Sequence, residues 1–458
     1  MNIVFIAPEC FPFAKAGSIA DLVSKLSKEI EKFGHNVKVF IPRYGSIDPV
    51  ISHIERVPVE FKVKANESPI ITSVFKGIIP DSLVSVFFIE SQNYFSNSKE
   101  IYLPQVQHEE RFKFFCTAVL DVIAKLKMEV DIFHLFSSCT TYTAKLLRSR
   151  NIEYAYLNKT AIVFTICESS DLNKNTLTNT CHGINNSDYI TTVSKTYAYE
   201  LLSDGRLSES LLQKKDLFCG ILSGIDENIY NPESDGEIAQ AYSKNYFSSG
   251  KRKCKEDLLG LVGLHTDMQI PLFGIELTMD EYNNKAEMLF NFLHEIACLN
   301  LQIVLFGKVS SKFENELIKA IDKYKNIKAI FNHEPIKKFY AGTDFFINLN
   351  KYEPSGTSVL TAMKYGSVPV AYATGGIKDI VIDVELGEEA NGIIFKNYSV
   401  EDLIDTIGKA IKLYKNKERW TKLVKQTMSF NLAELATAKK YLTCYERIVN
   451  HVHANLYQ

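Results

Sequence analysis

The residues best suited to chemistry lie between positions 351 and 381. A carboxylate, Glu353, precedes a Pro-Ser-Gly turn, the turn leads into a run with helical spacing, and Gly375-Gly376 follow a short β-rich run. A loop of this kind presents backbone N–H groups at a helix N-terminus, which favours a phosphate group. Glu353 would accept the hydroxyl groups of a sugar. The combination favours a nucleotide-sugar site, and the alternative is an ordinary strand–loop–helix unit with an exposed glutamate.

The elements that must position these residues alternate along the chain. Apolar β-rich runs and amphipathic helical patterns follow one another, which predicts α/β layers with parallel sheets. Strands are expected at residues 3–7, 37–42, 83–89, 132–135, 161–166, 189–193, 272–277, 302–306, 329–332, 344–348 and 368–373. Helices are expected at residues 19–33, 109–127, 140–148, 196–202, 285–298, 312–324, 400–414, 418–426 and 432–451.

The pattern restarts after residues 228–251, a segment rich in Asn, Ser, Pro and charge that is expected to join two domains. We predict two doubly wound, Rossmann-like domains that face each other across a cleft, with ligands outside the carboxyl ends of the strands. The first domain would comprise residues 1–230 with about 440–458 packing back onto it, and the second residues 231–440.

Composition excludes several classes of protein. The 458 residues are 46% hydrophobic and carry a net charge of −2, which gives no reason to expect a nucleic acid or a membrane surface as partner. The basic run Lys251-Arg252-Lys253 is expected on a solvated face. Nine scattered cysteines without a Cys-x-x-Cys pair, and a start without a basic leader, favour a cytoplasmic protein without a metal site.

Residues 6–47 resemble the opening of bacterial glycogen synthases and plant starch synthases. In that family the first strand leads into a Lys-x-Gly-Gly-Leu loop, which here reads Lys15-Ala16-Gly17-Ser18-Ile19. Residues 351–381 resemble the Glu-Pro-x-Gly segment and the Thr-Gly-Gly turn of the same family. Further agreement, in order along the chain to about residue 445, comes from residues 110–112, 190–194, 220–226 and 340–346.

This resemblance implies a retaining glucosyltransferase of the two-Rossmann-domain (GT-B) fold that takes glucose from ADP-glucose and needs no metal or cofactor. It implies that Glu353 binds the sugar and that Lys15 faces the donor. Further substrate contacts are implied for Gly17, Ser18, Gly356, Thr357, Ser358, Gly375 and Gly376, with weaker expectations for Tyr352 near the base and Lys285 at a phosphate. The histidines match no catalytic position of the family and are expected to be structural or surface residues.

The chain departs from the family pattern in the half of the site that would face the Glu353 loop. Glu276 stands where the family has an arginine that stabilises the leaving diphosphate, and Cys167 stands where it has a histidine that supports the sugar. Phe136-Ser137-Ser138 replaces a His-Asp-Trp group that faces the glucan. Ser18 replaces the second glycine of the first loop, which obstructs the loop only if that residue needs a positive φ.

Two functions stay open at this point. The first is a divergent glucosyltransferase that moves glucose from ADP-glucose or UDP-glucose to an α-1,4-glucan or another acceptor. The second is a catalytically impaired relative, a pseudoenzyme that acts as a nucleotide-sugar- or glucan-binding or regulatory module. Retained Lys15 and Glu353 favour the first, and the substituted positions favour the second. A third possibility is a transferase with a changed donor and acceptor, which the acidic segment 276–281 would permit.

Overall fold

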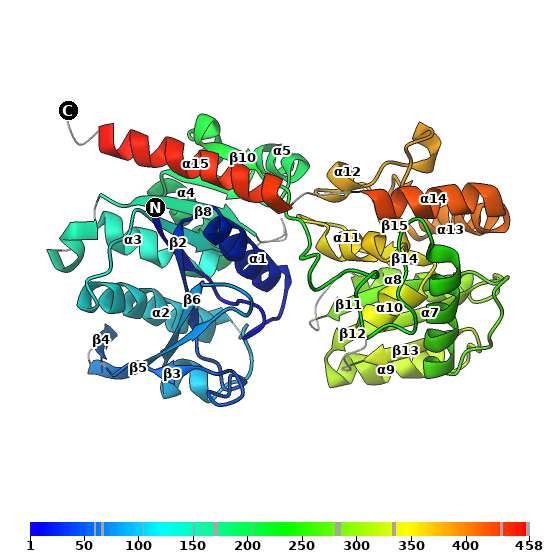
Figure 1. The fold of residues 1–458 in the computed structure, drawn as a ribbon, viewed down its shortest axis with the longest axis horizontal. Coiled ribbons are helices and arrows are strands. Elements are labelled where there is room, and N and C mark those ends of the chain that lie inside the picture. Colours follow the sequence, from blue (N-terminus) through cyan, green and yellow to red (C-terminus); the bar gives the residue numbers. More distant parts are fainter. Residues whose placement is uncertain are drawn as a thin grey trace. The chain divides into compact units, whose positions relative to one another are not determined.

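The computed structural model describes residues 1–58, 61–65, 68–103, 105–149, 152–157, 159–167, 173–203, 205–279, 285–331, 336–430 and 434–454. The chain divides into two compact units. Unit 1 comprises Met1–Gly224 and Leu432–Gln458, and unit 2 comprises Ile225–Asn431. Figure 1 shows an α/β architecture in each unit. Among the described helices, none has the length and apolarity needed to cross a membrane.

Unit 1 is built on a mostly parallel sheet with the strand order β10-β9-β8-β7-β1-β2-β6-β5-β3, and β4 pairs with β5. The parallel strands are β1 (Asn2–Ile6), β2 (Asn36–Pro42), β6 (Ser85–Glu90), β7 (Ile132–Phe136), β8 (Ala161–Ile166), β9 (Tyr189–Thr192) and β10 (Phe218–Gly220). The antiparallel edge consists of β3 (Glu55–Arg56), β4 (Phe61–Ala65) and β5 (Ser68–Ile78). The helices and turns of unit 1 are α1 (Ser18–Lys32), η1 (Gln92–Ser96), α2 (Gln105–Lys125), η2 (Ser138–Thr140), α3 (Tyr142–Arg148), η3 (Ile152–Leu157), α4 (Lys174–Asn186), α5 (Lys195–Ser203), α6 (Ser208–Leu212), η4 (Lys215–Leu217) and α15 (Glu434–Ala454).

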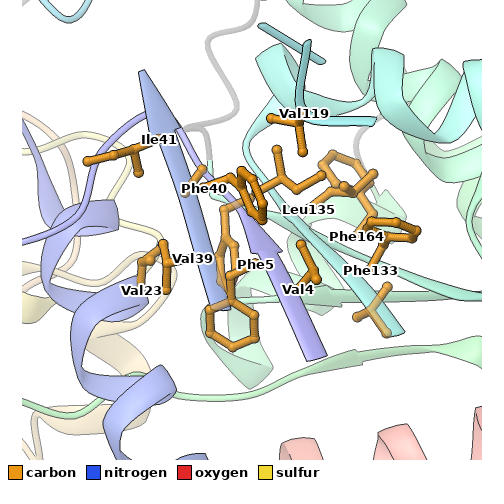
Figure 2. Close-up of a cluster of buried hydrophobic side chains, with 14 of the residues drawn as sticks. Val4, Phe5, Val23, Val39, Phe40, Ile41, Val119, Phe133, Leu135 and Phe164 are labelled. Carbon is orange, nitrogen blue, oxygen red and sulfur yellow. The ribbon is translucent and has the colours of Figure 1, made fainter. Parts of the chain in front are cut away.

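The central strands of unit 1 are almost continuously apolar because helices cover them. Figure 2 shows the core that results, in which Val4 and Phe5 of β1 lie among side chains of β2, β7 and β8. Val23 of α1 and Val119 of α2 add the helix layers, and both are fully buried. This packed sheet fixes the carboxyl ends of β1 and β7, where the candidate residues of unit 1 lie.

Unit 2 has a wholly parallel sheet with the order β13-β12-β11-β14-β15-β16. Its strands are β11 (Leu272–Met279), β12 (Gln302–Val309), β13 (Ile327–Phe331), β14 (Phe345–Asn348), β15 (Val368–Tyr372) and β16 (Ile393–Phe395). Its helices and turns are α7 (Phe247–Val262), α8 (Lys285–Ile296), α9 (Ser311–Ile321), α10 (Ile336–Gly342), α11 (Thr357–Lys364), α12 (Ile377–Ile380), η5 (Val384–Leu386), α13 (Val400–Lys415) and α14 (Lys417–Ser429).

Each sheet has a switch point, where the chain turns from one side of the first strand to the other. In unit 1 it lies between β1 and β7, and in unit 2 between β11 and β14. Loops that leave the carboxyl ends of two such strands diverge, and the crevice between them is the usual ligand site of a doubly wound sheet. The switch points therefore direct attention to residues 7–17 and 137–141 in unit 1 and to residues 276–279 and 349–356 in unit 2.

The C-terminal helix α15 belongs to unit 1, where it lies beside α1 and contacts β8 (Figure 1). Its Tyr445 hydroxyl lies 2.6 Å from Nδ1 of His134 on β7, and Nε2 of His134 lies 2.6 Å from the Thr165 hydroxyl. Burial lowers the pKa of His134 well below its usual range, so this ring is neutral and structural. The return of the last helix to the first unit agrees with the predicted fold.

Two expectations about local structure were wrong. No strand was expected at β4 or β5, although the sequence of β4, FKVKA, alternates apolar and polar residues as strands do; β5 has no such alternation. Lys251 does not lie on a solvated face, although Arg252 and Lys253 are exposed. Instead α7 turns Lys251 inward, where its Nζ donates to the carbonyls of Ala341 (3.2 Å), Thr343 (2.8 Å) and Tyr365 (2.9 Å). Burial lowers the pKa of this lysine to about 8.

Candidate functional site

Glu353 is held firmly in the loop between β14 and α11. Its Oε2 accepts hydrogen bonds from the side-chain amides of Asn348 (3.1 Å) and Asn350, and its Oε1 accepts from the Gly356 N–H (2.9 Å). A carboxylate has about four acceptor positions, so three donors orient the group and leave capacity for one more. Asn348 and Asn350 were missed by sequence reasoning, although their place at the end of a buried strand beside Glu353 marks them.

The glycine pair 375–376 packs directly against this loop. The Gly376 N–H donates to the Glu353 carbonyl (2.8 Å), and Gly375 has a φ of +44°. A Cβ at Gly375 would lie 2.3 Å from that carbonyl oxygen, and a Cβ at Gly376 would lie 2.6 Å from the Ser355 carbonyl. Both residues are therefore required for the close approach of two backbone segments, and this approach fixes the Glu353 loop.

Helix α11 begins immediately after the loop. Gly356 is its N-cap residue, with a φ of +69°, and Thr357 and Ser358 form its first turn. The first N–H groups of a helix lack intrahelical acceptors, so this turn points donors outward from the sheet edge. The Thr357 hydroxyl donates to the Ser355 hydroxyl (3.0 Å), and the exposed Tyr352 ring lies 5.8 Å from Nζ of Lys351.

Glu276 lies on the other strand of the same switch point. It follows Ile275, which pairs with Ile347, so Glu276 comes at the level of Asn348, the residue whose amide holds Glu353. The Tyr340 hydroxyl of α10 donates to Glu276 Oε2 (2.7 Å) and keeps the half-buried carboxylate in place. The carboxyl ends of β11 and β14 in unit 2 are thus accompanied by two carboxylates, Glu276 and Glu353. Residues 280–284 and the side chain of Lys285, at the start of α8, lie outside the described part of the structure.

In unit 1, Lys15 lies in the loop after β1. Its Nζ lies 2.8 Å and 2.6 Å from the two carboxylate oxygens of Asp21, in the first turn of α1. Gly17 is the N-cap of α1 and has an extended backbone with a φ of −144°. Ser18 is the first residue of α1 and is not among the residues with a positive φ. The serine that replaces the family's second glycine therefore causes no backbone obstruction.

A buried carboxylate organises this loop and was missed by sequence reasoning. Glu9 is fully buried, and its Oε2 accepts the N–H groups of Ala16 and Gly17 (3.0 Å for Gly17). Its Oε1 accepts the Tyr102 hydroxyl (3.2 Å). Burial raises the pKa of Glu9 above its usual value, and the two backbone donors oppose that shift. The only sequence signal was a single acidic residue inside the apolar and aromatic stretch after β1.

The substituted positions of unit 1 occupy the carboxyl ends of β7 and β8. Phe136 is fully buried and packs on His134 and Phe5, with ring centroids 4.0 Å and 5.0 Å away. Ser137 has a φ of +72° and Ser138 begins the short turn η2. Cys167 follows β8, and its Sγ lies 3.6 Å from the Thr165 carbonyl. The side chain at position 136 thus belongs to the core and presents nothing to a ligand.

A cavity of about 430 Å³ lies in unit 1 beside these residues. Its walls come from the segment before α2, from α2 itself, from η2 and α3, and from α4. Ser138 is one of its lining residues, together with Tyr102, the tyrosine that donates to Glu9. His108 of α2 also lines it, and burial beside Arg111 lowers the pKa of this histidine to about 4. Sequence reasoning treated His108 as unremarkable, because only the fold brings these segments together.

Comparisons with known proteins cover both units. The sequence-family model named starch synthase catalytic domain matches residues 2–214, and the one named glycosyl transferases group 1 matches residues 288–427. Glycogen synthase of Clostridium novyi is 30% identical over 98% of this chain and 100% of its own length. Glycogen synthase of Alkaliphilus metalliredigens is 29% identical, with 98% and 100% covered.

The fold agrees with these matches. The catalytic domain of starch synthase IV from Arabidopsis thaliana, solved bound to ADP and acarbose, superposes with a TM-score of 0.89 at 24% identity, over 98% of this chain and 99% of that one. At this identity the likeness shows the fold, which is that of two Rossmann-like domains. Sequence along its whole length and the arrangement of its sheets both place the chain in the glycogen and starch synthase family of GT-B glycosyltransferases.

Proposed function

We propose that this protein transfers glucose from a nucleotide sugar to an α-1,4-glucan, with ADP-glucose as the donor by resemblance, and that Glu276 slows the transfer. The observation that carries the proposal is the Glu353 loop. Its carboxylate is oriented by three N–H donors and retains acceptor capacity, and α11 begins beside it. A module with no sugar to orient has no evident need for such a constrained polar loop.

In the proposed reaction, the bond between the sugar's anomeric carbon and the diphosphate breaks while a glucan hydroxyl attacks that carbon, with retention of configuration. The proton of the hydroxyl passes to the departing diphosphate. Glu353 accepts hydroxyl groups of the glucose and fixes the ring. The first-turn N–H groups at Thr357 and Ser358 face the phosphates, which gain negative charge as they leave. The loop held by Gly375 and Gly376 lies close to the sugar and diphosphate. Donors fixed before the reaction need no reorganisation during it.

Lys15, in the loop after β1, is proposed to face the donor and to bind one of its phosphate oxygens. Lys15 would exchange its contact with Asp21 for a phosphate oxygen when donor binds. The carboxylate of Glu9 keeps two N–H groups of the loop pointing inward, so the loop contributes the lysine and little of its backbone. We place the reaction in the cytoplasm, because the scattered cysteines of the chain suit a reducing compartment.

Glu276 opposes the chemistry at the other strand of the switch point. A half-buried carboxylate in place of a cation repels a leaving diphosphate, and loss of one such stabilising group costs about 10²–10³-fold in rate. Tyr340 fixes this carboxylate at the sheet edge, which limits its ability to swing away.

The test is release of nucleotide from ADP-glucose, and separately from UDP-glucose, by the full chain with glycogen as acceptor. We expect slow release that rises at least tenfold in Glu276→Arg, because the substitution removes a repulsion and adds a cation. Glu276→Gln is the matched control, which removes only the repulsion and should give a smaller gain. No release from either donor by the parent protein or by Glu276→Arg contradicts the proposal.

The substitutions Glu276 and Phe136 favour a second candidate, a nucleotide-sugar-binding module without transfer. Under this function ADP-glucose would bind the parent protein, measured by calorimetry, and the binding would tighten in Glu276→Arg. Nucleotide release would stay at the level of the buffer. Binding without release in both proteins therefore selects the second candidate over the first.

A further inference from the structure

Two cysteines of unit 1 meet outside the candidate site. Cys219 is the middle residue of β10, the outer strand of the sheet, and Cys444 lies in α15. The Cys444 thiol donates a hydrogen bond to the Cys219 sulfur, and the Tyr189 hydroxyl on β9 donates to both sulfur atoms. The fold thus brings two sulfur atoms together from segments that are far apart in the sequence.

The backbone on both sides of this pair is held in place. Cys219 is paired with Thr191 in the parallel ladder between β10 and β9. On α15, the Thr437 hydroxyl donates to the Leu222 carbonyl (3.1 Å), just beyond β10. Tyr445, the neighbour of Cys444, reaches His134 through its hydroxyl, as described above. Because α15 is anchored before and after Cys444, the contact between the two thiols is a fixed feature of unit 1.

The surroundings of Cys219 favour its thiolate form. The hydrogen bond from Cys444 is the largest cause that lowers the pKa of Cys219, which falls to about 7 although burial opposes the shift. The Tyr189 hydroxyl and the positive charges of Lys440 and Arg447 on α15 act in the same direction. The hydrogen bond to Cys219 and burial raise the pKa of Cys444, which therefore remains a thiol. At neutral pH the pair holds a thiolate beside a thiol.

Buried cysteines elsewhere in the chain have the opposite character. Burial raises the pKa of the Cys10, Cys116 and Cys254 thiols, which keeps them protonated and unreactive. Cys219 is only half-buried, so a small reagent can reach it. A low thiol pKa, partial exposure and a second thiol in contact are together typical of cysteines that react reversibly with oxidants.

We infer that Cys219 and Cys444 form a reversible disulfide site, which peroxide oxidises and a dithiol reductant restores. The Cys219 thiolate attacks one oxygen of hydrogen peroxide, the O–O bond breaks, and a sulfenic acid forms. The hydroxide that leaves takes up the proton that Cys219 had released. The Cys444 sulfur then gives up its proton and attacks the Cys219 sulfur, so the S–S bond forms, the S–O bond breaks and the oxygen leaves as water. Two thiols are oxidised, and one peroxide is reduced to two waters.

The disulfide would join β10 to α15 covalently. The first part of unit 1 ends at Gly224, shortly after β10, and the second part begins at Leu432, shortly before α15. The bond therefore ties together the two segments of unit 1 through which the chain passes to and from unit 2. A reversible disulfide of this kind suits a redox sensor in a reducing compartment. The inference goes beyond the proposed function, since it involves neither Glu353 nor a nucleotide sugar.

The test is oxidation of the reduced full chain by a small excess of hydrogen peroxide, followed by alkylation of the remaining thiols and peptide mass spectrometry. We expect a cross-linked peptide pair that contains Cys219 and Cys444, and its loss after treatment with dithiothreitol. The midpoint of thermal unfolding should rise by at least about 5 °C in the oxidised protein, because the bond restricts the unfolded chain. These measurements use the parent protein and do not depend on the folding of a variant.

Three variants assign the steps to the two sulfur atoms. In Cys444→Ser, oxidation should stop at the Cys219 sulfenic acid, which dimedone traps, and in Cys219→Ser no such adduct should form at position 444. Cys298→Ser, which removes an exposed thiol of unit 2, is the matched control and should form the cross-link as the parent protein does. The inference is overturned if the oxidised parent protein lacks this cross-link, if another pair of cysteines forms in its place, or if dithiothreitol does not reverse it. Equal unfolding midpoints for the oxidised and reduced proteins overturn the tie between β10 and α15.

Discussion

The two switch points of the molecule each hold a glutamate that accepts backbone N–H groups from a glycine-containing loop. In unit 2, Glu353 is half-buried and is held mainly by side-chain amides, which leave it capacity for a ligand. In unit 1, Glu9 is fully buried and its oxygens serve the loop and Tyr102. We therefore propose that the same residue type offers a carboxylate to a ligand in unit 2, whereas in unit 1 it closes a loop, and that burial decides between the two roles.

The largest expected effect comes from removing Glu353, the half-buried member of this pair. Glu353→Ala should lower nucleotide release by about 10²–10³-fold, because the sugar loses a fixed charged acceptor. Stability should also fall, because Asn348 is buried and its side-chain amide loses its acceptor. Steady-state assays with ADP-glucose and glycogen measure the effect, and Glu353→Gln, which keeps an acceptor oxygen, should fall between. Equal rates in Glu353→Ala and the parent protein would remove Glu353 from the site.

The next effect tests whether backbone packing fixes the Glu353 loop. Gly375→Ala should destabilise the protein by about 2–3 kcal/mol, because its Cβ would lie 2.3 Å from the Glu353 carbonyl oxygen at a φ of +44°. Thermal or urea unfolding measures the loss. Gly408→Ala in α13, where a Cβ meets nothing within 4 Å, is the control and should stabilise by about 0.5–1 kcal/mol. Equal changes in the two variants would show that the contact relaxes freely.

A smaller effect is expected at Glu9, with a defined dependence on pH. Its pKa is raised in the folded state, mainly by burial, so the folded protein favours the protonated form more than the unfolded chain does. Glu9 therefore loses stabilising effect as the pH rises above the unfolded pKa, about 4.3. Glu9→Gln can keep all three hydrogen bonds without a buried charge. We expect it to equal or exceed the parent protein in stability at pH 7, and to lose that advantage toward pH 4.

The smallest effect is expected at Ser18. Ser18→Gly restores the family's second glycine, but Ser18 is already the first residue of α1. We expect a change of at most a few tenths of a kcal/mol in the free energy of unfolding, and unchanged nucleotide release. A gain of several-fold in release would show that the loop adopts a positive φ at this residue when donor binds.

The fold was predictable from sequence because its main strands are long apolar runs with helical patterns between them. The approximate position of the Glu353 loop was also predictable, since Pro-Ser-Gly before helical spacing marks a helix start. The roles of Glu9 and Tyr340 were not predictable, because each depends on partners that are distant in sequence. Lys251 shows the same limit, because a basic run predicts an exposed face, whereas its amine is surrounded by three carbonyls from two distant segments of the chain.

The buried contact between His134 and Tyr445 has a consequence for the order of folding. Unit 1 contains residues from both ends of the chain, so the part of its sheet at β8 that α15 contacts is covered only after all of unit 2 has been synthesised. The contact joins residues 311 positions apart, and closure over such a separation slows folding. A chain cut after residue 224 would leave the surface of β8 that α15 covers open to water. Unit 2 is continuous in sequence and can finish folding while residues 1–224 of unit 1 still lack their last helix.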